Sequence, residues 1–143
     1  VATLLKKEYA LAIIKNDPSD KAVFDVEGKD SWKFSQTGAE VVITSPTRTT
    51  LFSKRQKDLD EIITMLGDFD FLLVEGLKNL PLPRIAIFRN KLDESYFDCS
   101  DAIAVDESVT LSDYAIPSHI ALLDLNNPEQ VVAWIEKNAK KVK

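Results

Sequence analysis

The chain has 143 residues, of which 45% are hydrophobic and 29% are charged, a balance typical of a soluble globular domain and not of a disordered one. The formal net charge of −5 at pH 7 argues against a general attraction for nucleic acid. No apolar run approaches the roughly 20 residues that cross a membrane, and Cys99 is the only cysteine, which excludes an internal disulfide. We therefore expect a single cytoplasmic domain over residues 1–143, with neither nucleic acid nor a membrane as its partner.

The amino-terminal residues predict a helix followed by a buried strand. Residues 1–8 (VATLLKKE) have the pattern of the last turns of an amphipathic helix. Residues 9–14 (YALAII) form a continuous apolar run, which is typical of a strand buried on both faces. Because a domain rarely begins halfway along a helix without a cap, we expect further residues upstream of Val1.

A polar loop at residues 15–29 leads to a predicted helix. Asp30 or Ser31 can cap the amino terminus of this helix, which runs to about Thr37 and is ended by Gly38. A short β-hairpin and a second helix follow, at residues 40–44, 49–52 and 58–66. We expect the basic stretch before the second helix to be solvated surface, and its members are Lys54, Arg55 and Lys57.

The second half of the chain alternates short apolar strands with loops and closes on a helix. The strands are expected at residues 70–74, 84–88, 102–105 and 120–123. Asn126 or Asn127 caps the last helix, and Pro128 takes its first position. Continuous apolar strands that alternate with helices predict an α/β fold. Its form is a three-layer, mainly parallel sheet with helices on both faces and the β-hairpin as an insertion.

Polar residues gather where two of these strands end. Lys15 and Asp17 follow the first strand, and Glu75, Gly76 and Lys78 follow the strand at residues 70–74. The loop at residues 25–31 (DVEGKDS) adds further carboxylates and a lysine. In open parallel sheets, ligands bind at the carboxyl ends of the strands. Carboxylates suit Mg²⁺, and lysines with backbone N–H groups neutralise phosphate oxygens, so this mixture indicates phosphate chemistry.

Each of these residues also has a purely structural interpretation. Asp17 before a proline is typical of a turn, Ser31 of a helix cap and Lys78 of exposed surface. Asp106 follows the strand at residues 102–105, where it can accept hydrogen bonds from a guanine edge or cap its own loop. His119 has no serine or cysteine motif beside it, so no nucleophilic triad is indicated.

Six segments carry a likeness that covers nearly the whole chain in order. They are IIKND (13–17), DVEGKDSWKF (25–34), GAEVVITSPTRTTLF (38–52), DFLLVEGLK (70–78), PRIAIFR (83–89) and IALLDLNNPEQVVAWI (120–135). Together they resemble the molybdopterin-guanine dinucleotide biosynthesis adaptor family, MobB. The resemblance implies a P-loop GTP-binding fold that binds GTP with Mg²⁺ and hydrolyses it slowly. It also implies a homodimer that works beside the molybdopterin guanylyltransferase, in contact with molybdopterin or its dinucleotide.

The resemblance also implies roles for individual residues. Glu75 stands at the Walker B-like position and is expected to reach magnesium, while Gly76 lets the backbone approach the γ-phosphate. Asp17 is similar to a switch-region acid near magnesium, so Glu75 and Asp17 are the expected catalytic residues. The expected metal ligands are Asp17, Asp25 and Glu75. The expected nucleotide and phosphate contacts are Lys15, Gly76, Lys78, Lys29, Ser31 and Arg48, of which Lys29 and Ser31 belong to a switch-like loop.

The chain departs from the family in two respects. The first strand of the family and its G-x-x-x-x-G-K-[ST] loop do not occur within these residues, and Asn16 stands where members often carry histidine. Because that loop supplies the backbone cradle and lysine for the phosphates, we expect residues 1–143 alone to bind nucleotide very weakly. Two alternatives stay open. One is a P-loop kinase or ligase acting on a small acid, as in dethiobiotin synthetase, and the other is a non-catalytic interaction domain.

Overall fold

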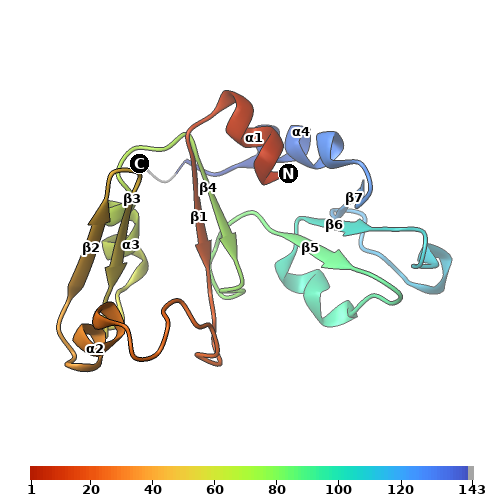
Figure 1. Cartoon of the computed structure of the whole chain (residues 1–143). Coiled ribbons are helices and arrows are strands. Elements are labelled where there is room, and N and C mark those ends of the chain that lie inside the picture. The colour runs from red at the N-terminus through yellow and green to blue at the C-terminus, as the bar shows by residue number, and fades with distance from the viewer. Residues whose placement is uncertain (142–143) are drawn as a thin grey trace. The chain divides into compact units, whose positions relative to one another are not determined.

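The computed structural model describes residues 1–141, which divide by their contacts into two compact units. One unit consists of Val1–Asn16 together with the chain from Phe69 onward, and the other is Asp17–Asp68 (Figure 1). The expectation that residues 1–143 form a single domain stays a prediction. No helix in the described part of the chain is long and apolar enough to cross a membrane.

In the first unit, helix α1 (Ala2–Glu8) leads into strand β1 (Leu11–Lys15), which pairs in parallel with β4 (Phe71–Glu75). The register runs from Leu11 opposite Phe71 to Lys15 opposite Glu75. The Asp70 carboxylate accepts a hydrogen bond from the Ala10 N–H at 2.7 Å, which fixes where the two strands begin. As a result, the two carboxyl ends finish level with each other.

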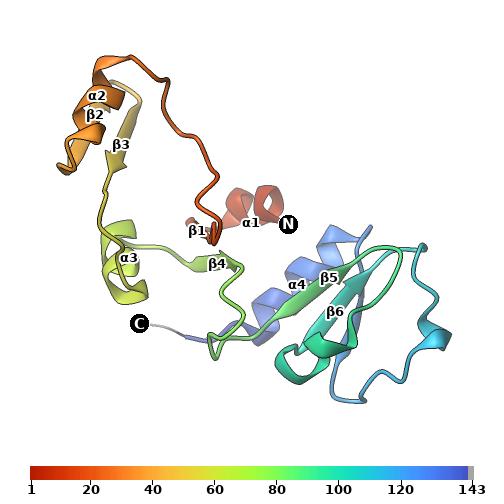
Figure 2. The same ribbon diagram turned by 90° about the horizontal axis from the view of Figure 1, so that it is seen from below.

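The same unit contains a second parallel sheet, in which β6 (Ala102–Val105) lies between β5 (Ile85–Phe88) and β7 (Ala121–Asp124). All four residues of β6 are buried, as expected for a central strand in a parallel sheet. Helix α4 (Pro128–Asn138) packs against one face of this sheet through Val131 (Figure 2). Residues of the short 3₁₀ helices η1 (Glu94–Cys99) and η2 (Leu111–Asp113) pack against the other face. Apolar burial on both faces makes this sheet the main core of the unit.

The second unit is built from two helices and a hairpin. Helix α2 (Asp30–Gln36) precedes the antiparallel pair β2 (Val41–Ser45) and β3 (Arg48–Phe52), and helix α3 (Leu59–Leu66) follows. Asp58 begins α3 with a capping box, because its side chain accepts from the Glu61 N–H while the Glu61 side chain accepts from the Asp58 N–H. Gly67 ends α3 with φ +72°.

The predicted α/β fold with parallel strand pairing is confirmed, and so are the β-hairpin and the Asn127 cap of α4. The strands of the described residues form three small sheets, and not the one continuous sheet that we expected. The predicted cap of α2 is wrong. Lys29 occupies the cap position without a side-chain hydrogen bond, because the Ser31 hydroxyl donates instead to the Asp25 carboxylate.

Candidate functional site

The carboxyl ends of β1 and β4 bring together two of the predicted site residues. Lys15 and Glu75 are register partners, and the Lys15 Nζ atom lies 2.6 Å from Glu75 Oε1. Both side chains remain about two-thirds exposed, at 66% and 68%. Exposed ion pairs contribute little to stability, so an incoming ligand can replace this contact at small cost. The pair therefore presents a cation and a carboxylate that are available to a ligand.

Among the four glycines, only Gly76 has a neighbouring residue within 4 Å of the place where a Cβ atom would stand. Its φ is +85°, and a Cβ atom added there would lie only 3.1 Å from Cβ of Asn16. The Asn16 N–H donates to the Glu75 carbonyl at 3.0 Å, which extends the pairing of the two strands by one residue. The close neighbour of Gly76 is thus Asn16, which stands where members of the resembled family often carry histidine.

Lys78 lies beside an aromatic ring. Its Nζ atom is 5.6 Å from the centroid of the Tyr96 ring, a distance typical of a cation–π contact. The pKa of Asp93 is lowered, first by hydrogen bonds from Ser95 and then by the charges of Lys78 and Lys91. Lys78 therefore has partners of its own next to η1, and its predicted phosphate contact stays a prediction.

Asp17, in the second unit, organises the loop that it begins. One carboxylate oxygen accepts hydrogen bonds from the Lys21 and Ala22 N–H groups, at 2.9 and 2.7 Å. This arrangement corresponds to the turn that the sequence offered as an alternative. Its predicted role as a magnesium ligand and catalytic acid stays a prediction.

Asp25 has one satisfied and one unsatisfied carboxylate oxygen. Oδ1 accepts from the Ser31 hydroxyl at 3.1 Å and from the Val26 N–H at 2.8 Å. Oδ2 is buried and has no hydrogen-bond partner among the described residues. A buried carboxylate oxygen without a partner is costly unless a cation, a water or a donor meets it. Asp25 therefore fits a Mg²⁺ ion better than any other predicted ligand of this unit.

The three predicted metal ligands, Asp17, Asp25 and Glu75, do not form a complete metal-binding group in the described residues. Within residues 1–141, no three His, Cys, Asp or Glu side chains come together as a metal-binding group. Mg²⁺ is commonly held by one or two carboxylates, with water and substrate phosphates completing its coordination. The residues present fit that kind of ion, which would neutralise phosphate charge, and do not fit an all-protein cage.

Lys29 and Arg48 are the two remaining phosphate contacts that were predicted in the second unit. Lys29 is the N-cap residue directly before α2, and Arg48 is the first residue of β3, directly after the hairpin turn. Both side chains are exposed. Their predicted phosphate contacts stay predictions.

Asp106 caps its own loop. Its carboxylate accepts from the Ser108 hydroxyl and N–H, and its other oxygen lies 3.3 Å from Arg89 Nε. The Ser108 hydroxyl is the main cause that lowers the pKa of Asp106, with Arg89 contributing less. Of the two interpretations of this residue, the loop cap is therefore the one that its contacts confirm.

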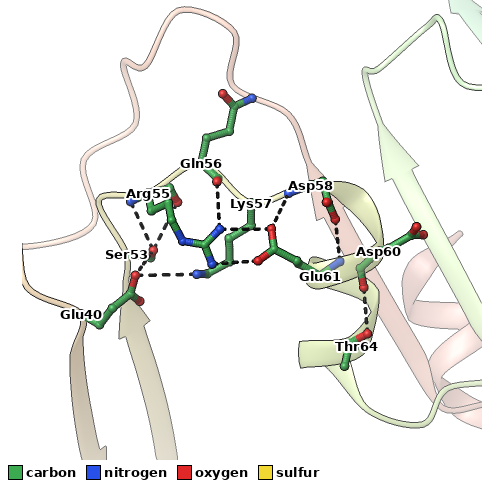
Figure 3. A network of polar contacts seen from close by, with 9 residues as sticks. All are labelled: Glu40, Ser53, Arg55, Gln56, Lys57, Asp58, Asp60, Glu61 and Thr64. Atoms are coloured by element: carbon green, nitrogen blue, oxygen red, sulfur yellow. Dashed lines mark hydrogen bonds and ion pairs between the residues drawn. The ribbon is translucent and has the colours of Figure 1, made fainter.

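Sequence reasoning missed a charged network that joins the hairpin to α3 (Figure 3). The Arg55 guanidinium binds both carboxylate oxygens of Glu61, at 2.8 and 3.2 Å, and Lys57 Nζ lies 3.7 Å from Glu40. The Lys57 side chain is only 14% exposed, so its assignment to solvated surface is wrong. The capping-box spacing from Asp58 to Glu61 was the available signal. The ion pair between Lys57 and the distant Glu40 had no such signal in the sequence.

A family model described as molybdopterin guanine dinucleotide synthesis protein B matches residues 1–107 of the chain. A protein of Methanocaldococcus jannaschii, named a putative molybdopterin-guanine dinucleotide biosynthesis adapter protein, is 31% identical over 117 residues, or 78% of this chain. The chain spans only 47% of that relative's length. The Haemophilus influenzae adapter protein of the same name is 25% identical over 95% of this chain, which covers 76% of the relative.

Two solved structures share the fold. The crystal structure of molybdopterin-guanine biosynthesis protein B has a TM-score of 0.69 at 22% identity, over 95% of this chain and 85% of the other. Bacillus subtilis MobB has a TM-score of 0.72 at 19% identity, over 97% and 85%. At these identities the likeness establishes the fold alone. Because the family model covers most of the residues, the chain belongs to the molybdopterin-guanine dinucleotide synthesis protein B family, MobB.

Proposed function

We propose that this chain belongs to a GTP-binding adaptor in molybdenum-cofactor biosynthesis, which assists the attachment of GMP to molybdopterin. The observation that carries the proposal is the Lys15–Glu75 pair beside Gly76, at the level carboxyl ends of two parallel strands in a chain of this family. The names of the relatives support the role in cofactor assembly. Slow hydrolysis of GTP with Mg²⁺ is part of the proposal.

The residues at this strand end suit the β- and γ-phosphates of a nucleotide. The Lys15 ammonium would leave Glu75 for a phosphate oxygen, and the freed carboxylate would face magnesium directly or through water. Gly76 would offer its N–H to the phosphate, because its missing side chain leaves the backbone open. In the second unit, Asp25 is the best-supported cation ligand, and Ser31, which donates to Asp25, is a proposed phosphate contact. The roles of Asp17, Lys29, Arg48 and Lys78 rest on the family resemblance.

Calorimetry of the full-length protein with GTP and ATP, with and without Mg²⁺, tests this proposal. We expect Mg²⁺-dependent binding that prefers GTP. In Glu75→Gln and Lys15→Met we expect the GTP affinity to fall by about tenfold or more, because each variant removes a charged contact. Lys137→Met is the matched control, since Lys137 is an exposed lysine of α4 away from these strand ends. A wild-type protein without affinity for either nucleotide would contradict the proposal and would favour the alternative of a non-catalytic interaction domain.

Phosphate release under the same conditions separates the adaptor from a kinase or ligase. The adaptor predicts slow turnover that no small acid accelerates. Fast phosphoryl transfer to a small carboxylated acceptor would favour the kinase or ligase.

The partners proposed for the adaptor are the cytoplasmic molybdopterin guanylyltransferase, molybdopterin or its dinucleotide, and a second copy of the chain. The second copy has structural support from the hairpin, where Val42 and Leu51 are register partners and are 58% and 38% exposed.

A further inference from the structure

The turn after β4 contains two consecutive residues in the left-handed backbone region. φ is +85° at Gly76 and +49° at Leu77. Glycine adopts this region freely, but in leucine the Cβ atom crowds the following carbonyl oxygen. The conformation of Leu77 is therefore held by contacts that other residues supply.

Two donors meet at the Leu77 carbonyl oxygen. The Leu80 N–H donates at 3.0 Å and closes the turn. Arg84 Nη2 donates at 3.2 Å from the start of β5. Hydrogen bonds from a charged donor are roughly twice as strong as neutral ones, so Arg84 is the stronger restraint on this carbonyl.

The backbone of Arg84 is itself fixed. Its N–H donates to the Asp101 carboxylate at 2.9 Å, and its carbonyl accepts from the Asp101 and Ala102 N–H groups, each at 3.0 Å. These bonds attach Arg84 to the residues that begin β6. The guanidinium thus extends from a rigid point of the sheet to the turn that follows Glu75.

The guanidinium is poorly satisfied where it lies. Arg84 is half-buried, and its buried Nε atom has no hydrogen-bond partner in residues 1–141. A buried N–H without an acceptor works against stability, so the Nε atom itself does not account for the placement of the side chain. Within residues 1–141, the hydrogen bond that the Arg84 side chain makes is the one with the Leu77 carbonyl.

We propose that Arg84 is a positioning residue that locks the Gly76–Leu77 turn, and through it the Glu75 carboxylate and the Gly76 N–H, for the phosphates of the bound nucleotide. The role of the ligand in this inference rests on the proposed function, whereas the restraint on the turn does not.

The test compares Arg84→Met with wild type in the full-length protein. Methionine keeps an apolar stem but removes the charge and the donors. Arg89→Met is the matched control, because Arg89 is 69% exposed and pairs with Asp106 away from the turn. Amide exchange of the Leu80 N–H reports the turn without any ligand, and calorimetry with Mg²⁺ and GTP reports the site.

In Arg84→Met we expect Leu80 exchange to accelerate about tenfold or more and the GTP affinity to fall by a similar factor, as loss of a charged hydrogen bond implies. Exchange in β6 should stay at its wild-type rate, and Arg89→Met should change neither readout. Wild-type Leu80 exchange in Arg84→Met would overturn the inference. Equal acceleration in β6 would also overturn it, since Arg84 would then act on general stability.

Two safeguards keep the test decisive. If Arg84→Met does not fold, Arg84→Gln takes its place, because its amide ends two bonds short of the Nη atoms and cannot make the same contact. If the wild type binds no nucleotide, the proposed function fails by itself, and Leu80 exchange still decides whether Arg84 holds the turn.

Discussion

At the scale of single residues, Gly76 connects the local backbone to the candidate site. It has a left-handed φ of +85° and is the one glycine with a side chain in its way, since Asn16 Cβ lies 3.1 Å from where its own Cβ would stand. Asn16 cannot rotate this atom aside, because Cβ is bonded directly to the backbone. A side chain at position 76 would therefore require Asn16 to move back by a few tenths of an ångström, at the end of the strands where Lys15 and Glu75 meet.

Gly76→Ala should lower the free energy of unfolding more than Gly38→Ala does. Gly38 has nearly the same φ, +83°, but nothing within 4 Å of an added Cβ, so it isolates the backbone effect of roughly 1–2 kcal/mol. The difference between the variants, measured by urea unfolding, reports the contact with Asn16. Equal losses would mean that Asn16 moves back without resistance.

At the scale of elements, hydrogen bonds and ion pairs connect the segment between β3 and α3 to its neighbours. Arg55 and Glu61 form a two-pronged ion pair, and the Glu61 carboxylate also accepts from the Asp58 N–H at 3.0 Å. These hydrogen bonds, Arg55 first, lower the pKa of Glu61 from 4.5 to about 2. The pKa of Glu40 is lowered too, mainly by the Ser53 hydroxyl.

The lowered pKa of Glu61 predicts an acid-sensitive contribution to stability. A carboxyl whose pKa is lower in the folded state stabilises fully above its unfolded pKa, near 4.5, and loses that contribution as the pH falls through about 2. Glu61→Gln should therefore flatten the pH dependence of unfolding in this window. Arg55→Met should flatten it as well, because Glu61 loses its main partner. Unfolding curves recorded from pH 5 to pH 2 test both, and a Glu61→Gln curve as steep as wild type would contradict the assignment.

These elements also show what sequence reasoning reached and where it stopped. Continuous apolar runs were enough to predict β1, β4 and β6 and to place Lys15 and Glu75 at neighbouring strand ends. Local patterns do not reveal partners from elsewhere in the chain. Ser31 was expected to cap α2 but bonds Asp25, and Lys57 was assigned to the surface but pairs with Glu40. The sequence placed Arg84 only at the start of an expected strand and did not reveal its hydrogen bond to the Leu77 carbonyl.

At the scale of the whole molecule, the β2–β3 hairpin needs stabilising contacts beyond its own two strands. Within the described residues, β2 and β3 pair only with each other. Two-stranded ribbons are marginally stable in water unless another strand or a helix supports them. Helix α2 contacts β2, yet Val42 and Leu51 stay exposed on one face. An exposed apolar face on a ribbon with free edges is typical of a surface that another chain covers.

The full-length protein is therefore expected to be a dimer that uses this face. Val42→Lys should shift the molar mass measured by light scattering toward the monomer, because each copy would bury an unpaired charge at a two-fold interface. Met65→Lys is the control, since it places the same charge on an exposed apolar residue of α3 in the same unit. A wild-type monomer at high concentration would exclude the dimer. A Val42→Lys protein that remained dimeric would move the interface to another surface, and the exposed apolar pair would then be available to the guanylyltransferase.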